Sequence, residues 1–214
     1  MDKLIMLNPS DYVGVSFWLI SAAMVAATFF FWVERDRAIG KWKTSLTVAA
    51  MVTGIAAIHY FYMRGVWIDT QQSPLVFRYV DWLLTVPLQI VEFYLILAAI
   101  AVVRAALFWK LMIASLVMLI FGFLGEGQLM NYWAAFVIGM AGWLYIVYEI
   151  FAGEASQINA SQGTEASKTA FNALRLIVTI GWAIYPLGYI LGDTMGAGAL
   201  NIIYNLADFV NKIA

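Results

Sequence analysis

Long apolar runs separated by short polar segments form the dominant pattern of this sequence. Residues 12–33 carry no charge, and residues 44–62 contain only His59 as a side chain that could be charged near neutral pH. An apolar stretch of about 20 residues can cross the roughly 30 Å hydrocarbon core of a bilayer as an α-helix. Seven such segments occur, at residues 12–33, 44–62, 76–103, 105–124, 132–150, 171–191 and 199–214. The pattern predicts an all-α membrane protein with one domain, a bundle of seven transmembrane helices.

Three details refine this prediction. The last segment has only 16 residues, which is short for a membrane crossing, so we expect a truncated seventh helix. Residues 152–168 are clearly polar and predict a connection between the fifth and sixth helices. Pro87 and Pro186 lie within predicted helices, where each removes a backbone hydrogen bond and predicts a kink.

Composition excludes several other classes of protein. Hydrophobic residues make up 64% of the chain and charged residues 12%, whereas soluble domains average about 45–50% and 25%. The net charge is −1, so the basic excess expected of a nucleic-acid-binding protein is missing. The chain has no cysteine, which excludes disulfides and thiolate metal sites. We expect no metal site and no nucleic-acid partner.

The basic residues predict how the bundle is oriented. The first, third and fifth connections and their edges carry eight of them: Arg35, Arg37, Lys41, Lys43, Arg104, Lys110, Lys168 and Arg175. The N-terminus and the even-numbered connections carry only Lys3 and Arg64. Because basic residues accumulate on the cytoplasmic side, we expect the N-terminus outside and the C-terminus in the cytoplasm.

Five charged residues lie well inside the predicted spans: Arg78, Asp81, Glu92, Asp208 and Lys212. A charged side chain at the centre of a membrane helix costs about 2.5–3.5 kcal/mol on insertion scales. One such residue could simply join helices by polar packing. Five of them on two helices indicate a functional site.

The spacing of these residues predicts a path for protons. Asp81 and Glu92 are 11 residues apart, so they share a helix face and differ by roughly 16 Å in depth. Asp208 and Lys212 are four apart and also share a face. By depth, Lys212 is expected between the outer carboxyl of Asp81 and the inner carboxyl of Glu92.

Charge balance assigns different states to these groups. Lys212 and Arg78 balance Asp81 and Asp208, as a low-dielectric interior requires. Glu92 is left without a cation in an apolar region, so we expect it to be protonated at rest. A neutral acid in that position is suited to donate a proton.

Lys212 has two possible roles on this evidence. It could be a partner for the carboxylates, or it could be a nucleophile that forms a Schiff base with a carbonyl ligand. Such a ligand would need a long apolar slot. The side chains of Trp182, Tyr185, Pro186 and Tyr189 follow helical spacing on one face, and Trp82 and Tyr204 could supply further walls. The same aromatic stripe could also be ordinary helix packing.

Several motifs resemble those of microbial rhodopsins. Residues 78–87 read RYVDWLLTVP and resemble their third helix, while residues 181–186 read GWAIYP and resemble their sixth. Residues 208–212 read DFVNK and resemble their seventh. Residues 59–67 and 204–209, which read HYFYMRGVW and YNLADF, are typical of the proteorhodopsin branch. The resemblance extends from about residue 12 to residue 212.

The resemblance implies a function and a role for each charged residue. The chain would be a light-driven outward proton pump, with Lys212 binding all-trans retinal as a protonated Schiff base. Asp81 would be counter-ion and primary proton acceptor, and Asp208 the second counter-ion. Arg78 would bridge toward the exterior, and Glu92 would be the cytoplasmic proton donor.

The resemblance also implies roles for the surrounding residues. His59 would hydrogen-bond Asp81 near a neighbouring subunit, close to Trp18 of that subunit. Retinal would be enclosed by Trp82, Trp182, Tyr185, Pro186 and Tyr204. Gln89 would tune the colour, since glutamine at this position accompanies blue absorption in the branch. The family usually forms pentamers or hexamers, and a bacterial inner membrane is the implied location.

Three positions separate the functional types within the family. Chloride pumps lack a carboxylate at the position of Asp81, and sodium pumps have Asn, Asp and Gln at the positions of Asp81, Thr85 and Glu92. Many sensory types lack the carboxyl at the position of Glu92. This chain therefore resembles the proton pumps. A slow-cycling sensory photoreceptor and a seven-helix transporter without retinal remain alternatives.

Overall fold

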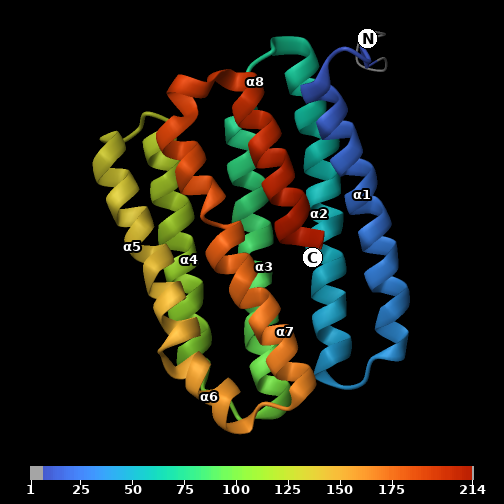
Figure 1. Ribbon diagram of the computed structural model, residues 1–214, viewed down its shortest axis with the longest axis vertical. Coiled ribbons are helices and arrows are strands. Elements are labelled where there is room, and N and C mark those ends of the chain that lie inside the picture. The colour runs from blue at the N-terminus through green and yellow to red at the C-terminus, as the bar shows by residue number, and fades with distance from the viewer. Residues whose placement is uncertain (1–6, 214) are drawn as a thin grey trace.

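The computed structural model describes residues 7–213, in which every regular element is a helix (Figure 1). The α-helices are α1 (Tyr12–Glu34), α2 (Lys41–Thr70), α3 (Leu75–Ile100), α4 (Ala105–Glu126), α5 (Tyr132–Phe151), α6 (Glu154–Gln162), α7 (Glu165–Leu176) and α8 (Ile184–Ile213). A 3₁₀ turn, η2 (Arg35–Arg37), follows α1, and a π-helical segment, η3 (Ile177–Gly181), follows α7. The predictions that fall on Lys3 and Ala214 lie outside the described residues.

These elements make seven passes along the bundle. Helices α1 to α5 are the first five, and α7, η3 and the first part of α8 form the sixth. Gly196 then turns the chain back within α8, and the remaining residues of that helix form the shorter seventh pass. Six of the described helical stretches are long and apolar enough to cross a membrane. The prediction of an all-α, seven-helix membrane bundle is confirmed.

Several boundaries differ from those expected from the sequence. The second helix continues to Thr70 and ends where Gln71 adopts a left-handed conformation with φ of 55°. The third helix ends at Ile100 instead of residue 103, because Ala101 is extended. The polar stretch 152–168 is largely helical. Thr164 caps α7 there by accepting a hydrogen bond from the backbone N–H of Ser167, so the sixth pass begins earlier than residue 171.

The prolines behave differently from the expectation. Helix α3 continues on both sides of Pro87 without interruption, so the predicted kink is not marked by a break there. In the sixth pass the irregularity precedes Pro186. The backbone N–H of Trp182 bonds to the carbonyl of Ile177 at 2.9 Å, which is π-helical, and the N–H of Tyr185 bonds to the carbonyl of Trp182 at 3.1 Å. Pro186 has no N–H to give to that carbonyl, which explains why regular α-helix resumes only here.

Two apolar clusters fill the bundle. One surrounds α3 and contains buried side chains of α4, α5, α7 and α8, such as Phe93, Leu107 and Phe171. The other joins α1 to α2 through Phe17, Met24 and Tyr60 among others. Large apolar side chains also remain exposed on the outward faces of the helices, as expected of a protein whose solvent there is lipid.

Replacing Gly196 tests the turn between the sixth and seventh passes. Gly196 has φ of 77° and ψ of 157°, a conformation that residues with a side chain rarely adopt. Because open space surrounds the missing Cβ, the cost of Gly196→Ala is backbone strain alone. We expect the substitution to lower the free energy of unfolding in detergent by about 1–3 kcal/mol.

Gly192→Ala is the matched control, because Gly192 lies in the regular helix and its added Cβ would be 3.5 Å from Leu200. Alanine is the better helix former, so this variant should be as stable as the parent or more stable. Equal stability of the two variants would contradict the assigned turn.

Candidate functional site

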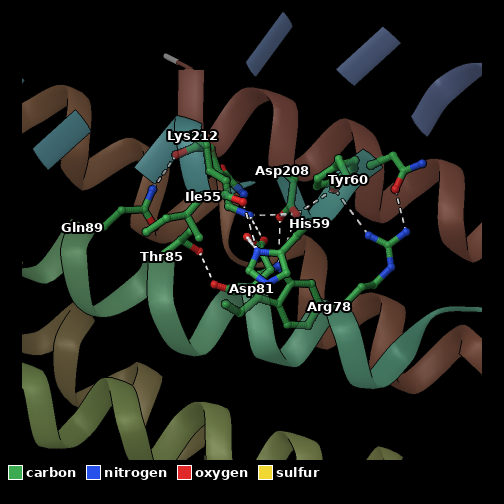
Figure 2. Close-up of polar contacts among 12 residues, drawn as sticks. Ile55, His59, Tyr60, Arg78, Asp81, Thr85, Gln89, Asp208 and Lys212 are labelled. Atoms are coloured by element: carbon green, nitrogen blue, oxygen red, sulfur yellow. Dashed lines mark hydrogen bonds and ion pairs between the residues drawn. The ribbon is translucent and has the colours of Figure 1, made fainter. Parts of the chain in front are cut away.

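The centre of the bundle holds a buried lysine between two buried carboxylates (Figure 2). Nζ of Lys212 donates to Oδ2 of Asp81, from α3, and to Oδ2 of Asp208 at 2.9 Å, from its own helix α8. The lysine side chain is 2% exposed and both carboxylates are 0% exposed. Buried charges of this kind are tolerated only when they are paired, so the three groups depend on one another.

Asp208 is fully occupied as a hydrogen-bond acceptor. Besides Lys212, it accepts from the hydroxyl of Tyr60 at 2.7 Å, the hydroxyl of Tyr185 at 2.5 Å and Nε1 of Trp82 at 3.1 Å. A carboxylate has about four acceptor positions, and these donors use them. Asp208 is therefore built to remain an anion.

Asp81 differs from Asp208 in having a free oxygen. Its Oδ1 accepts no hydrogen bond from the residues that the structure describes. Nδ1 of His59, from α2, lies 3.4 Å from this oxygen and 3.0 Å from the carbonyl of Ile55. A carbonyl can only accept, so Nδ1 carries a proton and directs it mainly toward Ile55. Asp81 thus has an oxygen that can receive a proton.

Arg78 lies one turn before Asp81 on α3 and is completely buried. Its Nη2 donates to the side-chain oxygens of Asn201 at 2.7 Å and Asn205 at 2.6 Å. Its guanidinium also lies over the ring of Tyr204, 5.5 Å from the centroid. The asparagines, which the sequence analysis missed, accept hydrogen bonds from the arginine without neutralising its charge.

Thr85 and Gln89 continue the same face of α3. The hydroxyl of Thr85 donates to the backbone carbonyl of Asp81 at 2.9 Å, so it is not used by the Asp81 carboxylate. Nε2 of Gln89 donates to the backbone carbonyl of Asn211 at 2.7 Å. Gln89 therefore ties α3 to the residue that precedes Lys212.

Glu92 is isolated farther along α3. It is partly buried, and no residue within 7–213 forms a hydrogen bond or an ion pair with its carboxyl. Eleven residues of helix separate it from Asp81, which corresponds to about 16 Å along the axis. The two carboxyls thus lie at different depths, one paired with Lys212 and one alone.

A cavity extends from Lys212 between α3, α4, α5 and α8. Its empty volume, including the mouth, is about 780 Å³, within the range of small-molecule pockets. The predicted ligand-binding side chains all line it: Trp82, Gln89, Trp182, Tyr185, Pro186, Tyr204 and Lys212. The sequence analysis missed further lining residues, including Met118, Gly122, Glu126, Phe136, Gly139 and Trp143.

Trp18 and His59, which were expected near a neighbouring subunit, both reach the surface of the bundle. Trp18 lies away from the charged centre, 46% exposed on α1, with the guanidinium of Arg64 4.9 Å from its ring centroid. The side chain of His59 is 19% exposed. Across the described residues no cluster of three or more His, Cys, Asp or Glu side chains could hold a metal ion.

The sequence of this chain matches a known protein family. A sequence model of the family described as bacteriorhodopsin-like protein matches residues 11–214. The chain belongs to this family. Membership and the six long apolar helices together make the bacteriorhodopsin-like chain a multi-pass membrane protein.

The bacteriorhodopsin-like chain is similar to proteorhodopsins of two colours. It is 60% identical over 212 residues to the blue-light absorbing proteorhodopsin of Gamma-proteobacterium Hot 75m4, covering 97% of this chain and 84% of the relative. It is 58% identical over 211 residues to the green-light absorbing proteorhodopsin of Gamma-proteobacterium EBAC31A08, with the same coverage. Overall identity therefore does not decide the colour.

The crystal structure of blue light-absorbing proteorhodopsin from Med12 is similar to the bacteriorhodopsin-like chain throughout. The TM-score is 0.83 at 57% identity, and the match covers 95% of this chain and 93% of that one. The resemblance stated from the motifs is confirmed by these comparisons.

The cavity of the bacteriorhodopsin-like chain suits a conjugated aldehyde such as retinal. Its walls are mainly aromatic and aliphatic, and Lys212 presents one primary amine to it. Gly122 and Gly139 line the cavity from α4 and α5, and a Cβ at Gly122 would come within 2.9 Å of the Tyr79 hydroxyl. An amine beside an apolar slot is the donor set that a Schiff-base ligand requires.

Proposed function

We propose that this chain is a light-driven outward proton pump that carries all-trans retinal on Lys212. The observation that supports it most directly is the position of Lys212 between two unlike carboxyls. One, Asp81, contacts the amine and has a free oxygen, and the other, Glu92, stands alone deeper on the same helix. Ionisable groups inside a membrane helix are energetically costly, so their presence indicates a functional site.

Rhodopsins of this family bind retinal as their chromophore. When bound to Nζ of Lys212 as a protonated Schiff base, retinal would supply light absorption and a light-driven displacement of that proton. Trp82, Trp182, Tyr185, Pro186 and Tyr204 would hold it, since they line the cavity next to the amine. The remaining steps belong to side chains of the protein.

Asp81 takes the proton from Nζ of Lys212. The two groups are in direct contact, so no intermediate carrier is needed. Asp208 stays anionic because its acceptor positions are occupied by Tyr60, Tyr185 and Trp82. The proton therefore leaves toward Asp81 and the end of α3 at which Arg78 lies.

Glu92 returns a proton to Nζ of Lys212. It lies about 16 Å from Asp81 along α3, toward the opposite end of the bundle. Its carboxyl has no hydrogen-bond or ion-pair partner within the described chain, so burial favours the neutral, protonated form over the charged one. In that form Glu92 can donate a proton. Each proton exported this way works against about 2.3 kcal/mol per 100 mV of membrane potential.

Net transport in one direction requires that Nζ of Lys212 first has access to Asp81 and then to Glu92. The break at η3 and Trp182–Ala183 lies in the sixth pass, and Trp182 lines the same cavity as Lys212. Bending at this break opens the half of the bundle that contains Glu92. Pro186 fixes where regular helix resumes and so fixes the hinge.

The proposal extends to the orientation of the protein, its membrane and its oligomeric state. The distribution of Lys and Arg supports an orientation with the start of α1 outside and the end of α8 in the cytoplasm, and we propose a bacterial inner membrane as the location. We propose a homo-oligomer, a pentamer or a hexamer, in which Trp18 and the partly exposed His59 lie near the subunit boundary. A sensory photoreceptor would have no need of a proton donor at Glu92.

Illumination of cells expressing the protein with all-trans retinal tests the proposal. We expect an unbuffered suspension to become more acidic in light, and an uncoupler to abolish the change. Asp81→Asn should form a pigment without pumping, because the direct acceptor is lost. Asp69→Asn, which changes an exposed carboxylate at the end of α2, should pump normally.

The possible failures separate the alternatives. A pigment that leaves the medium unchanged would contradict the pump and favour a photoreceptor. The absence of any visible pigment would contradict both and leave a transporter without retinal.

We further propose that the pigment absorbs blue light. The amide of Gln89 donates to the backbone carbonyl of Asn211 and lines the same cavity as Lys212, so it places an amide dipole in the wall of the chromophore site. Gln89→Leu removes that dipole, and we expect the absorption maximum to move to longer wavelength. Gln157→Leu, on the exposed face of α6, should leave the spectrum unchanged. An unshifted spectrum for Gln89→Leu would exclude the assignment of colour to this residue.

A further inference from the structure

The π-helical segment η3 leaves one backbone carbonyl without its usual partner. In a regular α-helix the carbonyl of Val178 would accept from the N–H of Trp182, four residues later. That N–H bonds instead to the carbonyl of Ile177 at 2.9 Å, and the next one, of Ala183, bonds to the carbonyl of Thr179 at 3.2 Å. Val178 is buried, and a buried carbonyl without a donor is energetically costly. The carbonyl of Val178 therefore needs a donor from outside its own helix.

The indole of Trp143 supplies that donor from α5. Its Nε1 donates to the carbonyl of Val178 at 2.9 Å, and the same side chain lines the cavity that Lys212 also lines. Helix α5 is packed closely on α4 at this level, since a Cβ at Gly142 would come within 2.6 Å of the backbone oxygen of Ala114. Trp143 thus links a firmly packed wall of the cavity to the carbonyl that η3 leaves without a backbone donor.

The two sides of η3 are held by different neighbours. After η3, the hydroxyl of Tyr189 donates to the backbone carbonyl of Tyr132 at 2.8 Å, and the hydroxyl of Tyr132 donates to the backbone carbonyl of Tyr189. These bonds join the sixth pass to the start of α5. Before η3, the ring of Phe171 packs 5.4 Å from the ring of Phe93, which follows Glu92 on α3. Bending at η3 would therefore separate α7 from α3 beside Glu92 while the other side keeps its contacts with α5.

We infer that Trp143 is a positioning residue that keeps the hinge at η3 in its π-helical form. While Nε1 of Trp143 bonds to the carbonyl of Val178, the N–H of Trp182 stays with Ile177 and the irregularity persists. Without that donor, the N–H of Trp182 leaves Ile177 and bonds to Val178, and the segment becomes regular α-helix. Bending then has to break a backbone hydrogen bond that the π-helical form does not contain. The inference deepens the proposed pumping function, on which its kinetic consequence rests.

Asn211 also lies against η3 but does not share this role. A Cβ at Gly181, the last residue of η3, would overlap Oδ1 of Asn211, so the two backbones approach closely there. Nδ2 of Asn211 donates to the hydroxyl of Tyr185 at 3.1 Å, away from the carbonyl of Val178. Asn211 therefore limits the room around η3, and Trp143 supplies the hydrogen bond that distinguishes its π-helical form.

Crystal structures of the retinal-free protein test the inference without any pigment. Trp143→Phe keeps a ring in the cavity wall but cannot donate a hydrogen bond, so we expect the N–H of Trp182 to bond to the carbonyl of Val178. Benzothienylalanine in place of Trp143 keeps the shape of the indole and replaces its N–H by sulfur, and the same change is expected. The parent and Trp109→Phe, which changes an exposed tryptophan of α4, should keep the π-helical segment. A π-helical segment that persists without the indole N–H would overturn the inference.

Flash spectroscopy of the pigment tests the consequence for the hinge. In Trp143→Phe we expect proton transfer from Lys212 to Asp81 at the parent rate, because the bond from Trp143 takes no part in that contact. The return of a proton from Glu92 should be about two- to tenfold slower, the range that one net hydrogen bond corresponds to. Return at the parent rate, or faster, would contradict the inference. Failure of the proposed function looks different, since the parent itself would then export no protons, and the retinal-free structures would still decide the role of Trp143.

Discussion

A charged lysine held between two carboxylates in the middle of a membrane protein is the interaction on which this structure depends. Lys212 and Asp208 come from α8, and Asp81 comes from α3, so the contact fixes these helices against each other. Removing the lysine charge leaves two buried carboxylates without the cation that they share, at a cost of about 3–5 kcal/mol. The hydroxyls and the indole around Asp208, and the asparagines around Arg78, supply hydrogen bonds to these buried charges.

The two carboxylates in this cluster have unlike surroundings, and the proposed direction of transport rests on that difference. Asp208 is surrounded by donors and has no room for a proton, while Asp81 keeps one oxygen without a hydrogen bond. Glu92 is separated from both by a stretch of helix. In the proposed mechanism, a proton at Lys212 therefore has one nearby acceptor, Asp81, and one distant source, Glu92. In the proposed mechanism, the irregular helix at η3 in the sixth pass is the place where access changes.

Much of this was predictable from the sequence, and the remainder has identifiable causes. Long apolar runs predicted the passes, and buried charges at helical spacing predicted which residues meet. The polar stretch 152–168 was misjudged because short helices there are set by local caps such as Thr164. The break before Pro186 could not be located, since a proline restricts the preceding turn without specifying a π-helix. The partners of Arg78 were missed, although Asn201 and Asn205 share the face of Asp208 and Lys212.

The covalent attachment of the chromophore to Lys212 is the most direct test of the whole account. The parent, Lys212→Ala and the control Lys110→Ala, which changes an exposed lysine of α4, are each incubated with all-trans retinal. The proteins are then denatured in acid and freed of unbound pigment before their absorption spectra are recorded. The account predicts a covalently retained chromophore in the parent and in Lys110→Ala, and none in Lys212→Ala. A chromophore that remains attached to Lys212→Ala would contradict it.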